Sequence, residues 1–142
     1  MSERHPFPSA AWVAAYEKEI NGSEKYRAAS TQWTHGAVAL VVNARPEIGL
    51  NDAVGVWLDL DRGVCRQAKV VTVAEASTAA FVLTSDYGRW KEVILKQLAP
   101  IAGIMQRKIT LQGSLPIVVR FIKSAEELVE AATRVPTRFL DE

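Results

Sequence analysis

The residues of this chain that could carry out chemistry are few, and they stand far apart. Its only histidines are His5 and His35, and its only cysteine is Cys65. No Cys, Asp or Glu accompanies the histidines at the spacing of metal ligands, so the sequence predicts no metal site. No histidine stands near Cys65 to activate its thiol, and a small buried hydrophobic side chain is the better interpretation of this residue.

One pair of carboxylates has a spacing that paired acid–base catalysts also use. Asp59 and Asp61 lie two residues apart in an alternating segment, so they share one face of a strand. A solvated strand end beside the turn at 61–63 explains them better. The sequence also contains no GxGxxG, P-loop or GxSxG motif. We therefore expect no catalytic residues, no cofactor and no enzymatic activity.

Length and composition favour one globular domain over residues 1–142, with 49% hydrophobic and 23% charged residues. A net charge of +1 argues against nucleic acid as a partner. The first residues mix charges with prolines and lack the apolar core of a signal peptide. The chain also has no apolar run of the roughly 18 residues that span a bilayer. With a single cysteine, these features predict a cytoplasmic protein.

The elements that would position a site begin with two amphipathic helices. Ser9 is expected to cap the first helix, which ends at Asn21-Gly22. Ser23 is expected to cap the second, whose apolar face reaches Trp33. Strand-type patterns follow, and the alternation from Val54 to Leu60 is the clearest of them. The strands are expected over residues 37–42, 54–60, 64–73, 79–84 (with Ala79, Phe81 and Leu83 on one face) and 108–112.

Helical periodicity dominates the last third of the chain. A helix after Ser85 or Asp86 is expected to carry Trp90, Val93, Ile94 and Leu98 on one face. Three more helices are expected: one with Pro100 in its first turn, one opened by Ser114, and one after a capping box at 124–127 that ends at Pro136. Residues 138–142 are expected to form a tail. This order predicts an α+β fold with an antiparallel or mixed sheet and helices packed on one face.

Four local patterns together resemble the sterol carrier protein 2 (SCP2) lipid-binding family, in its stand-alone bacterial or archaeal form. They extend over most of the chain, from Trp12 to Phe139. The patterns are residues 21–29 followed by Trp33, the hairpin 56–63, residues 85–87 with Trp90 and continuing through 98–100 and 104–105, and the strand 108–113.

The resemblance implies a five-stranded, mostly antiparallel sheet with helices over one face and a hydrophobic tunnel between the layers. Members bind sterols, fatty acids or fatty acyl-CoAs without covalent chemistry. The implied function is therefore non-catalytic binding and transfer of a hydrophobic lipid. Two alternatives stay open: an accessory protein that presents a polyprenyl-quinone precursor or another lipid to partner enzymes, and an enzyme with a small apolar substrate.

The apolar stretch from residue 81 to residue 135 is the part of the chain expected to hold the lipid. From Asp86 to Lys123 it carries seven cations and two acids, a net charge of +5. Ordinary solvated helix faces explain this bias, and so does a basic rim that attracts an anionic head group or an anionic membrane surface. No protein partner is indicated. The expected lipid-binding residues are Phe81, Leu83, Trp90, Ile94, Ile101, Ile104, Met105, Leu115, Val118, Val119 and Ile122.

Overall fold

The structure, a computed structural model, describes residues 3–142 and is built on a five-stranded sheet. Its strands are β2 (Val38–Val42), β3 (Val54–Asp61), β4 (Val64–Val71), β5 (Phe81–Ser85) and β6 (Thr110–Gln112). Across the sheet they run in the order β4-β3-β2-β5-β6. Only the β2–β5 pair is parallel, and the other three pairs are antiparallel. The predicted α+β fold with a mostly antiparallel sheet is confirmed.

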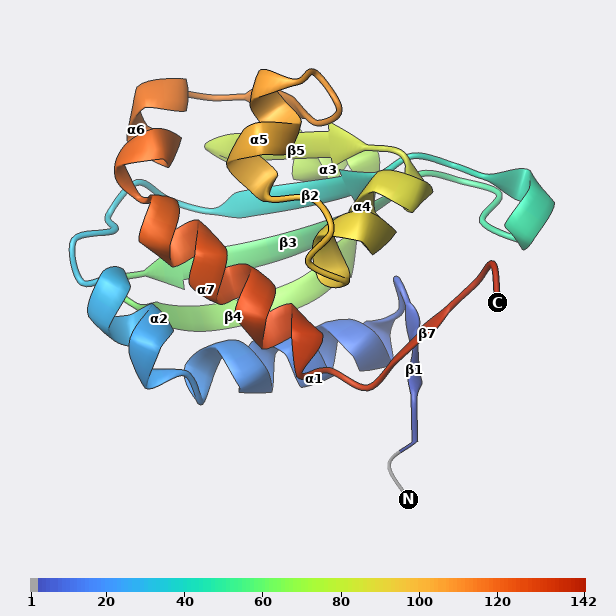
Figure 1. The fold of residues 1–142 in the computed structure, drawn as a ribbon, viewed down its shortest axis with the longest axis horizontal. Coiled ribbons are helices and arrows are strands. Elements are labelled where there is room, and N and C mark those ends of the chain that lie inside the picture. Colours follow the sequence, from blue (N-terminus) through green and yellow to red (C-terminus); the bar gives the residue numbers. More distant parts are fainter. Residues whose placement is uncertain (1–2) are drawn as a thin grey trace.

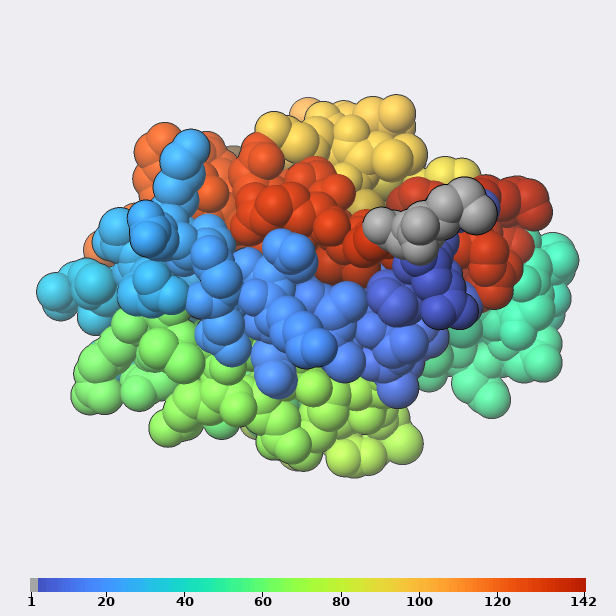
Figure 2. Space-filling view, turned by 90° about the horizontal axis from the view of Figure 1, so that it is seen from below, coloured from blue at the N-terminus to red at the C-terminus, as the bar shows by residue number. Residues whose placement is uncertain are grey.

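A layer of helices covers one face of this sheet (Figure 1). It consists of α1 (Ala10–Asn21), α2 (Glu24–Ala29), α4 (Tyr87–Ile94), α5 (Pro100–Met105), α6 (Leu115–Arg120) and α7 (Ile122–Thr133). Figure 2 shows α1 between the β4 segment and α7, so this helix closes one side of the space between sheet and helices. The main hydrophobic core fills that space.

The opposite face of the sheet carries a smaller core under one short helix that the sequence did not predict. This helix, α3 (Val73–Ala76), begins at Thr72, whose side chain forms a capping box with Glu75. β4 therefore ends at Val71, two residues earlier than predicted. Ala79 packs in this second core and not with Phe81 and Leu83, because the strand begins only at Phe81. A 3-10 turn, η1 (Pro46–Ile48), lies between β2 and β3.

The two ends of the chain pair with each other as short parallel strands, β1 (His5–Phe7) and β7 (Thr137–Phe139). The predicted C-terminal tail is therefore ordered structure. Tyr87 holds both strands, because its hydroxyl donates to the Phe7 carbonyl at 2.7 Å and accepts from the Leu140 N–H at 2.9 Å. Strands of three residues are too short to show a period in the sequence, so this pairing was not predictable.

Three helix boundaries differ from the prediction. α2 ends at Ala29, so Trp33 lies beyond it, although its ring is buried. α4 ends at Ile94 before Lys96, whose positive φ of 62° no helix accepts, and Leu98 is buried outside the helix. α7 begins directly after Phe121, so the stretch predicted as a capping box lies inside its first turns.

Candidate ligand cavity

A cavity of about 130 Å³ lies between the sheet and the helices that cover it. Three neighbouring strands form its floor, each contributing residues from one face. Side chains alternate across a strand, so every second residue of these strands points to the same side. These floor residues are Val38, Leu40 and Val42 of β2, Val56, Leu58 and Leu60 of β3, and Phe81 and Leu83 of β5.

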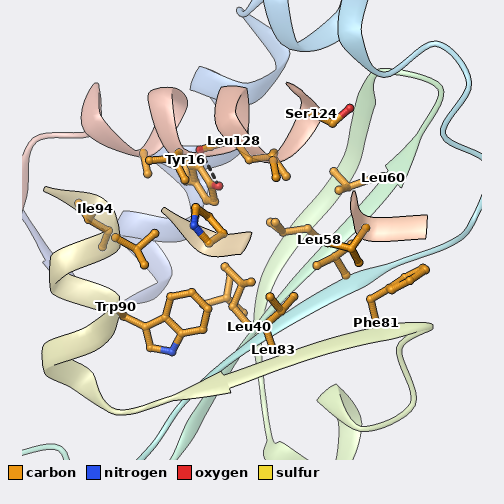
Figure 3. A pocket seen from close by; sticks show the side chains of 18 of the residues that line it. Tyr16, Leu40, Leu58, Leu60, Phe81, Leu83, Trp90, Ile94, Ser124 and Leu128 are labelled. Atoms are coloured by element: carbon orange, nitrogen blue, oxygen red, sulfur yellow. Dashed lines mark hydrogen bonds between the residues drawn. The ribbon is translucent and has the colours of Figure 1, made fainter. Parts of the chain in front are cut away.

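Leu40 stands at the centre of this floor. It pairs with Val56 on one side and with Leu83 on the other, so three aliphatic side chains lie level across the sheet. Figure 3 shows Leu40, Leu83 and Trp90 around the same space. Leu40 is only half-buried although β2 is the central strand. It is also one of the residues that line the cavity.

The helices form the roof of the cavity with stripes of apolar side chains. Trp90, Val93 and Ile94 of α4 follow the spacing of one helix face, and the α7 stripe repeats every three or four residues. Ile104 and Val118 come from α5 and α6. The α7 residues are Ser124, Ala125, Leu128, Val129 and Ala132, and aromatic rings of Phe7, Trp12, Tyr16, Tyr26, Trp33 and Phe121 complete the lining with Pro100.

Polar atoms of the lining residues bond to the protein and leave hydrocarbon facing the cavity. The Tyr16 hydroxyl donates to the Leu128 carbonyl at 2.9 Å, the dashed line in Figure 3. The Trp90 indole N–H donates to the Val41 carbonyl at 2.8 Å, and that of Trp33 to the Gly36 carbonyl at 3.0 Å. Within residues 3–142 no buried side-chain nitrogen or oxygen lacks a partner. The walls formed by Tyr16, Trp33 and Trp90 therefore offer burial and no directed polar contact.

Ser124 is the one polar side chain on the α7 stripe, and it fixes the helix to α2. Its Oγ donates to the Ala29 carbonyl at 3.0 Å and lies 2.7 Å from the Ser30 Oγ. Because its own hydrogen goes to Ala29, Ser124 accepts from Ser30. The sequence motif around Ser124 looks like a helix cap, so its role as a bridge between two helices was missed.

The titratable groups near the cavity stay uncharged at neutral pH. Burial raises the pKa of Tyr16 far above its usual range, and the neighbouring Tyr26 and Cys65 add to this effect. Burial likewise raises the pKa of Tyr26 to about 12 and that of Cys65 to about 12. A neutral buried thiol is a poor nucleophile, so the interpretation of Cys65 as a buried small side chain is confirmed.

The two aspartates considered for chemistry are not among the residues that line the cavity, whereas the His35 ring lies 5.2 Å from that of Trp33 and 5.6 Å from that of Phe121, both of which line it. Asp59 pairs with Arg66 at 2.9 Å and Asp61 with Arg62 at 3.1 Å, so each carboxylate has its own surface partner. In residues 3–142 no group of three His, Cys, Asp or Glu side chains is placed to hold a metal ion. None of the helices described for this chain is long and apolar enough to cross a membrane.

The structure brings six of the eleven expected lipid-binding residues together in the lining: Phe81, Leu83, Trp90, Ile94, Ile104 and Val118. Ile101 and Leu115 are half-buried outside the lining. Met105, Val119 and Ile122 are 65%, 45% and 42% exposed. Neighbours along a helix point about 100° apart, so Met105 and Val119 turn outward when Ile104 and Val118 turn inward.

Most residues of the cavity floor were not predicted to bind lipid, because the sequences of β2 and β3 are typical of ordinary core strands. Their alternation was visible in the sequence, and it places Leu40 and Leu58 on the face that the helices cover. The α7 stripe and the aromatic rings of α1 were likewise visible only as amphipathic helix faces. No sequence signal distinguishes a residue that packs against a neighbour from one that packs against empty space.

The roof is least firmly held at α5 and α6. α6 has no buried residue, and the only one in α5 is Gly103. Pockets that hold drug-sized ligands measure about 300–1,000 Å³, which exceeds the volume of this cavity. We expect that a ligand with a long chain would need the roof to move, and that these two short helices would move at the least cost.

We predict that residues 99–107 and 113–123 exchange their amide hydrogens early in the ligand-free protein. Short helices depend on packing, and these two are packed weakly. The β3–β4 hairpin should exchange late, and adding a fatty acid should slow α5 and α6. Hydrogen-exchange mass spectrometry measures all three segments together. Equal protection of α6 and the hairpin, unchanged by the fatty acid, would place the entrance elsewhere.

Comparison with known proteins gives matches that agree with each other. The model of the SCP-2 sterol transfer family matches residues 19–126. A crystal structure of sterol carrier protein 2 is 36% identical, with a TM-score of 0.83, and the match covers 89% of this chain and 97% of that one. A search of curated proteins finds no match.

Two further solved structures share the fold. A conserved hypothetical protein from Thermus thermophilus is 35% identical, with a TM-score of 0.84, covering 97% of this chain and 94% of its own. The ubiquinone synthesis protein UbiJ-SCP2 is 19% identical, with a TM-score of 0.53, covering 89% of this chain and 97% of its own. The latter likeness is one of fold alone.

Proposed function

We propose a lipid-binding function from one premise: this chain belongs to the SCP-2 sterol transfer family. In this proposal the cavity between the sheet and helices α4 to α7 takes up one hydrophobic lipid, and the protein carries or transfers it without covalent chemistry. The candidate ligands are fatty acids, fatty acyl-CoAs and sterol-like or isoprenoid lipids. With a ligand inside, the cavity would extend into the hydrophobic tunnel that the sequence led us to expect.

The observation that carries this proposal is the hydrocarbon wall of the cavity. The Tyr16 hydroxyl and the indole N–H groups of Trp33 and Trp90 donate hydrogen bonds to backbone carbonyls, so these side chains present hydrocarbon to the cavity. A wall of this kind attracts a ligand by the burial of apolar surface, at about 0.8 kcal/mol for each CH₂ group. A sixteen-carbon chain would gain on the order of 12 kcal/mol, against roughly 4–15 kcal/mol for association and ordering. At the low end of that cost about 8 kcal/mol remains, which corresponds to micromolar binding.

A non-catalytic role follows from the same lining. Acid–base catalysis needs a group whose pKa lies near the working pH. The Tyr26 hydroxyl, with its pKa raised to about 12, keeps its proton at neutral pH, and Tyr16 keeps its proton more firmly still. The free, buried Cys65 further supports a cytoplasmic location within this proposal, since unpaired thiols persist in reducing compartments.

The alternative is an accessory protein that presents a lipid, such as a polyprenyl-quinone precursor, to biosynthetic enzymes. The shared fold of UbiJ-SCP2, a ubiquinone synthesis protein, supports keeping this alternative. It uses the same cavity and differs in needing a protein partner. An enzyme that co-purifies with the chain would favour it over free transfer.

Titration with a fluorescent fatty acid tests the proposed function. We expect saturable binding at one site per chain in the micromolar range, and competition by unlabelled fatty acid. An isoprenoid probe and a sterol probe in parallel titrations would rank the ligand classes. If none of the three probes binds saturably, the proposed function is wrong.

A further inference from the structure

Three aromatic side chains, Trp33, Phe81 and Phe121, close one end of the cavity, and we call this the aromatic end. The Trp33 ring lies 5.2 Å from that of Phe81 and 5.0 Å from that of Phe121, centre to centre. All three residues line the cavity. Figure 3 shows Phe81 and Trp90 on opposite sides of Leu40, so the aromatic end lies across the cavity from Trp90.

The His35 imidazole packs against the aromatic end without lining the cavity itself. Its ring meets the rings of Trp33 and Phe121 edge to face, at 5.2 Å and 5.6 Å. The Trp33 indole N–H donates to the Gly36 carbonyl at 3.0 Å, and this bond closes the loop that carries His35. His35 is half-buried, and its imidazole forms no hydrogen bond within residues 3–142. Even a neutral imidazole has one N–H to donate, so His35 can bind a ligand atom at this end.

A cation stands beside the same aromatic end. The guanidinium carbon of Arg120 lies 5.9 Å from the centre of the Phe121 ring. The Arg120 side chain is exposed and forms no ion pair within residues 3–142. His35 and Arg120 therefore bring two groups with donors available to a ligand to the edge of one lining ring.

Other charged groups near the aromatic end already have partners. The Arg62 N–H donates to the Trp33 carbonyl at 2.8 Å, and the Arg62 side chain pairs with Asp61 at 3.1 Å. Lys123, two residues after Phe121, pairs with Glu126 at 3.6 Å. These pairs balance their own charges, so they neither replace Arg120 nor cancel it.

The opposite end of the cavity offers a weaker site for a charged group. Ile94 and Ala132 line the cavity, and they also line a surface groove of about 340 Å³ beside Lys96. The Lys96 ammonium pairs with Glu130 across this groove's edge of α4 and α7. An anion at this end would have to compete with the Glu130 carboxylate, whereas Arg120 has no such competitor among its described neighbours.

We propose that the cavity binds a fatty acid in one orientation, with its carboxylate at His35 and Arg120 and its chain directed toward Trp90. The inference rests on the proposed function and names the ligand class of that same cavity. An isolated carboxylate pays a large desolvation cost in an apolar space, so it stays at the rim while the chain enters. At this rim the imidazole N–H and the guanidinium can both donate to the carboxylate oxygens.

The same two groups favour a fatty acid over a neutral lipid. Hydrogen bonds between ionised partners are roughly twice as strong as neutral ones, and a guanidinium matches a carboxylate with two parallel bonds. The hydroxyl of a sterol or an isoprenoid alcohol carries no charge and gains little from Arg120. Chain burial attracts all of these ligands alike, so the head group decides between them.

Titrations with palmitic acid and hexadecanol test the assignment, because the two ligands share one chain and differ in the head group. H35L/R120Q should weaken the binding of palmitic acid by about tenfold or more and that of hexadecanol by less than about twofold. Normal hexadecanol binding by this variant also shows that its cavity is intact. R120Q alone, at an exposed position, should show a smaller loss for palmitic acid.

H5L/R138Q is the matched control, because it replaces the same two residue types on the paired strands β1 and β7. Figure 1 shows these strands at the chain ends, on the opposite side of the molecule from α6. The control should bind both ligands like the unchanged chain. The assignment is wrong if H35L/R120Q binds palmitic acid normally, if it loses both ligands equally, or if the control loses palmitic acid as strongly.

The assignment and the proposed function fail through different results. If both ligands bind and H35L/R120Q does not distinguish them, the chain keeps the proposed function and loses the carboxylate site. If neither ligand binds and a sterol probe does not bind either, the proposed function fails and the carboxylate site fails with it. Palmitoyl-CoA separates the two anionic groups, because its acyl carbonyl carries no charge. Weakening of palmitoyl-CoA but not of palmitic acid would identify a phosphate site and overturn the assignment.

Discussion

Replacing Leu40 by Trp is expected to abolish the binding of a fatty acid while the chain stays folded. Leu40 lies at the centre of the cavity floor, between Val56 and Leu83. An indole at this position would occupy space that the acyl chain needs, on the order of four CH₂ groups. At about 0.8 kcal/mol for each CH₂ group, the loss amounts to about 3 kcal/mol, or more than about a hundredfold in affinity.

The fold should tolerate this change because the new ring enters open space. Overpacking a filled core costs about 1–3 kcal/mol, and we expect a cost at or below the lower end for Leu40→Trp. Fatty-acid titration and urea unfolding of the same preparation measure both quantities. Val64→Trp, at a position of β4 that is 45% exposed and pairs with Asp61 rather than with a floor residue, is the matched control and should bind like the unchanged chain. Normal binding by Leu40→Trp would place the ligand outside this cavity.

Trp12→Ala should cause the largest loss of stability, about 3–5 kcal/mol. The Trp12 ring lies 4.8 Å from the Phe7 ring and 4.9 Å from the Tyr16 ring, centre to centre. Its indole N–H donates to the Thr137 hydroxyl at 2.8 Å. Removing it would leave a void between α1 and the paired strands β1 and β7. Domains of this class have total stabilities of about 5–15 kcal/mol, so the variant should be close to unfolding.

Chemical denaturation of Trp12→Ala and Trp57→Ala gives the comparison. Trp57 is only half-buried and packs beside the smaller core on the other face of the sheet, so its removal should cost clearly less. Trp12→Phe should recover part of the loss by restoring an aromatic ring. Equal destabilisation by Trp12→Ala and Trp57→Ala would contradict the position of Trp12 as the link between the main core and the chain ends.

The sheet and most helices were predictable because their signals are local. Ser9, Ser23 and Ser114 cap helices as expected, since a cap needs only the few residues that follow it. The β3–β4 hairpin shows its alternation and its turn within one short stretch. The resemblance to the SCP2 family supplied the five-stranded sheet with helices over one face, which no local pattern contains.

The missed features depend on contacts between distant parts of the chain. The Ser124 hydroxyl of α7 donates a hydrogen bond to the Ala29 carbonyl at the end of α2. The residues that follow Ser124 in the sequence predict a helix cap instead. The pairing of His5–Phe7 with Thr137–Phe139 joins the two ends of the chain. α3 replaced the end of a predicted strand because the capping box of Thr72 and Glu75 favours a turn there.

The lipid-binding residues were predicted only in part, because the orientation of a short helix also depends on contacts with distant parts of the chain. Helical periodicity identified the apolar faces of α4, α5 and α6, but it could not say which of two adjacent residues faces inward. Ile104 and Val118 turned out to line the cavity, whereas Met105 and Val119 lie on the outside. In helices as short as α5 and α6, the orientation is set by the neighbouring elements.

Native mass spectrometry of the intact chain, before and after incubation with a fatty acid, an isoprenoid and a sterol, would show whether the cavity holds a lipid. We expect one bound lipid per chain, either carried through purification or taken up from the added mixture. We also expect Leu40→Trp to stay empty under the same conditions. If the folded chain neither retains nor takes up any of the three lipids, it is not a lipid-binding protein of this kind.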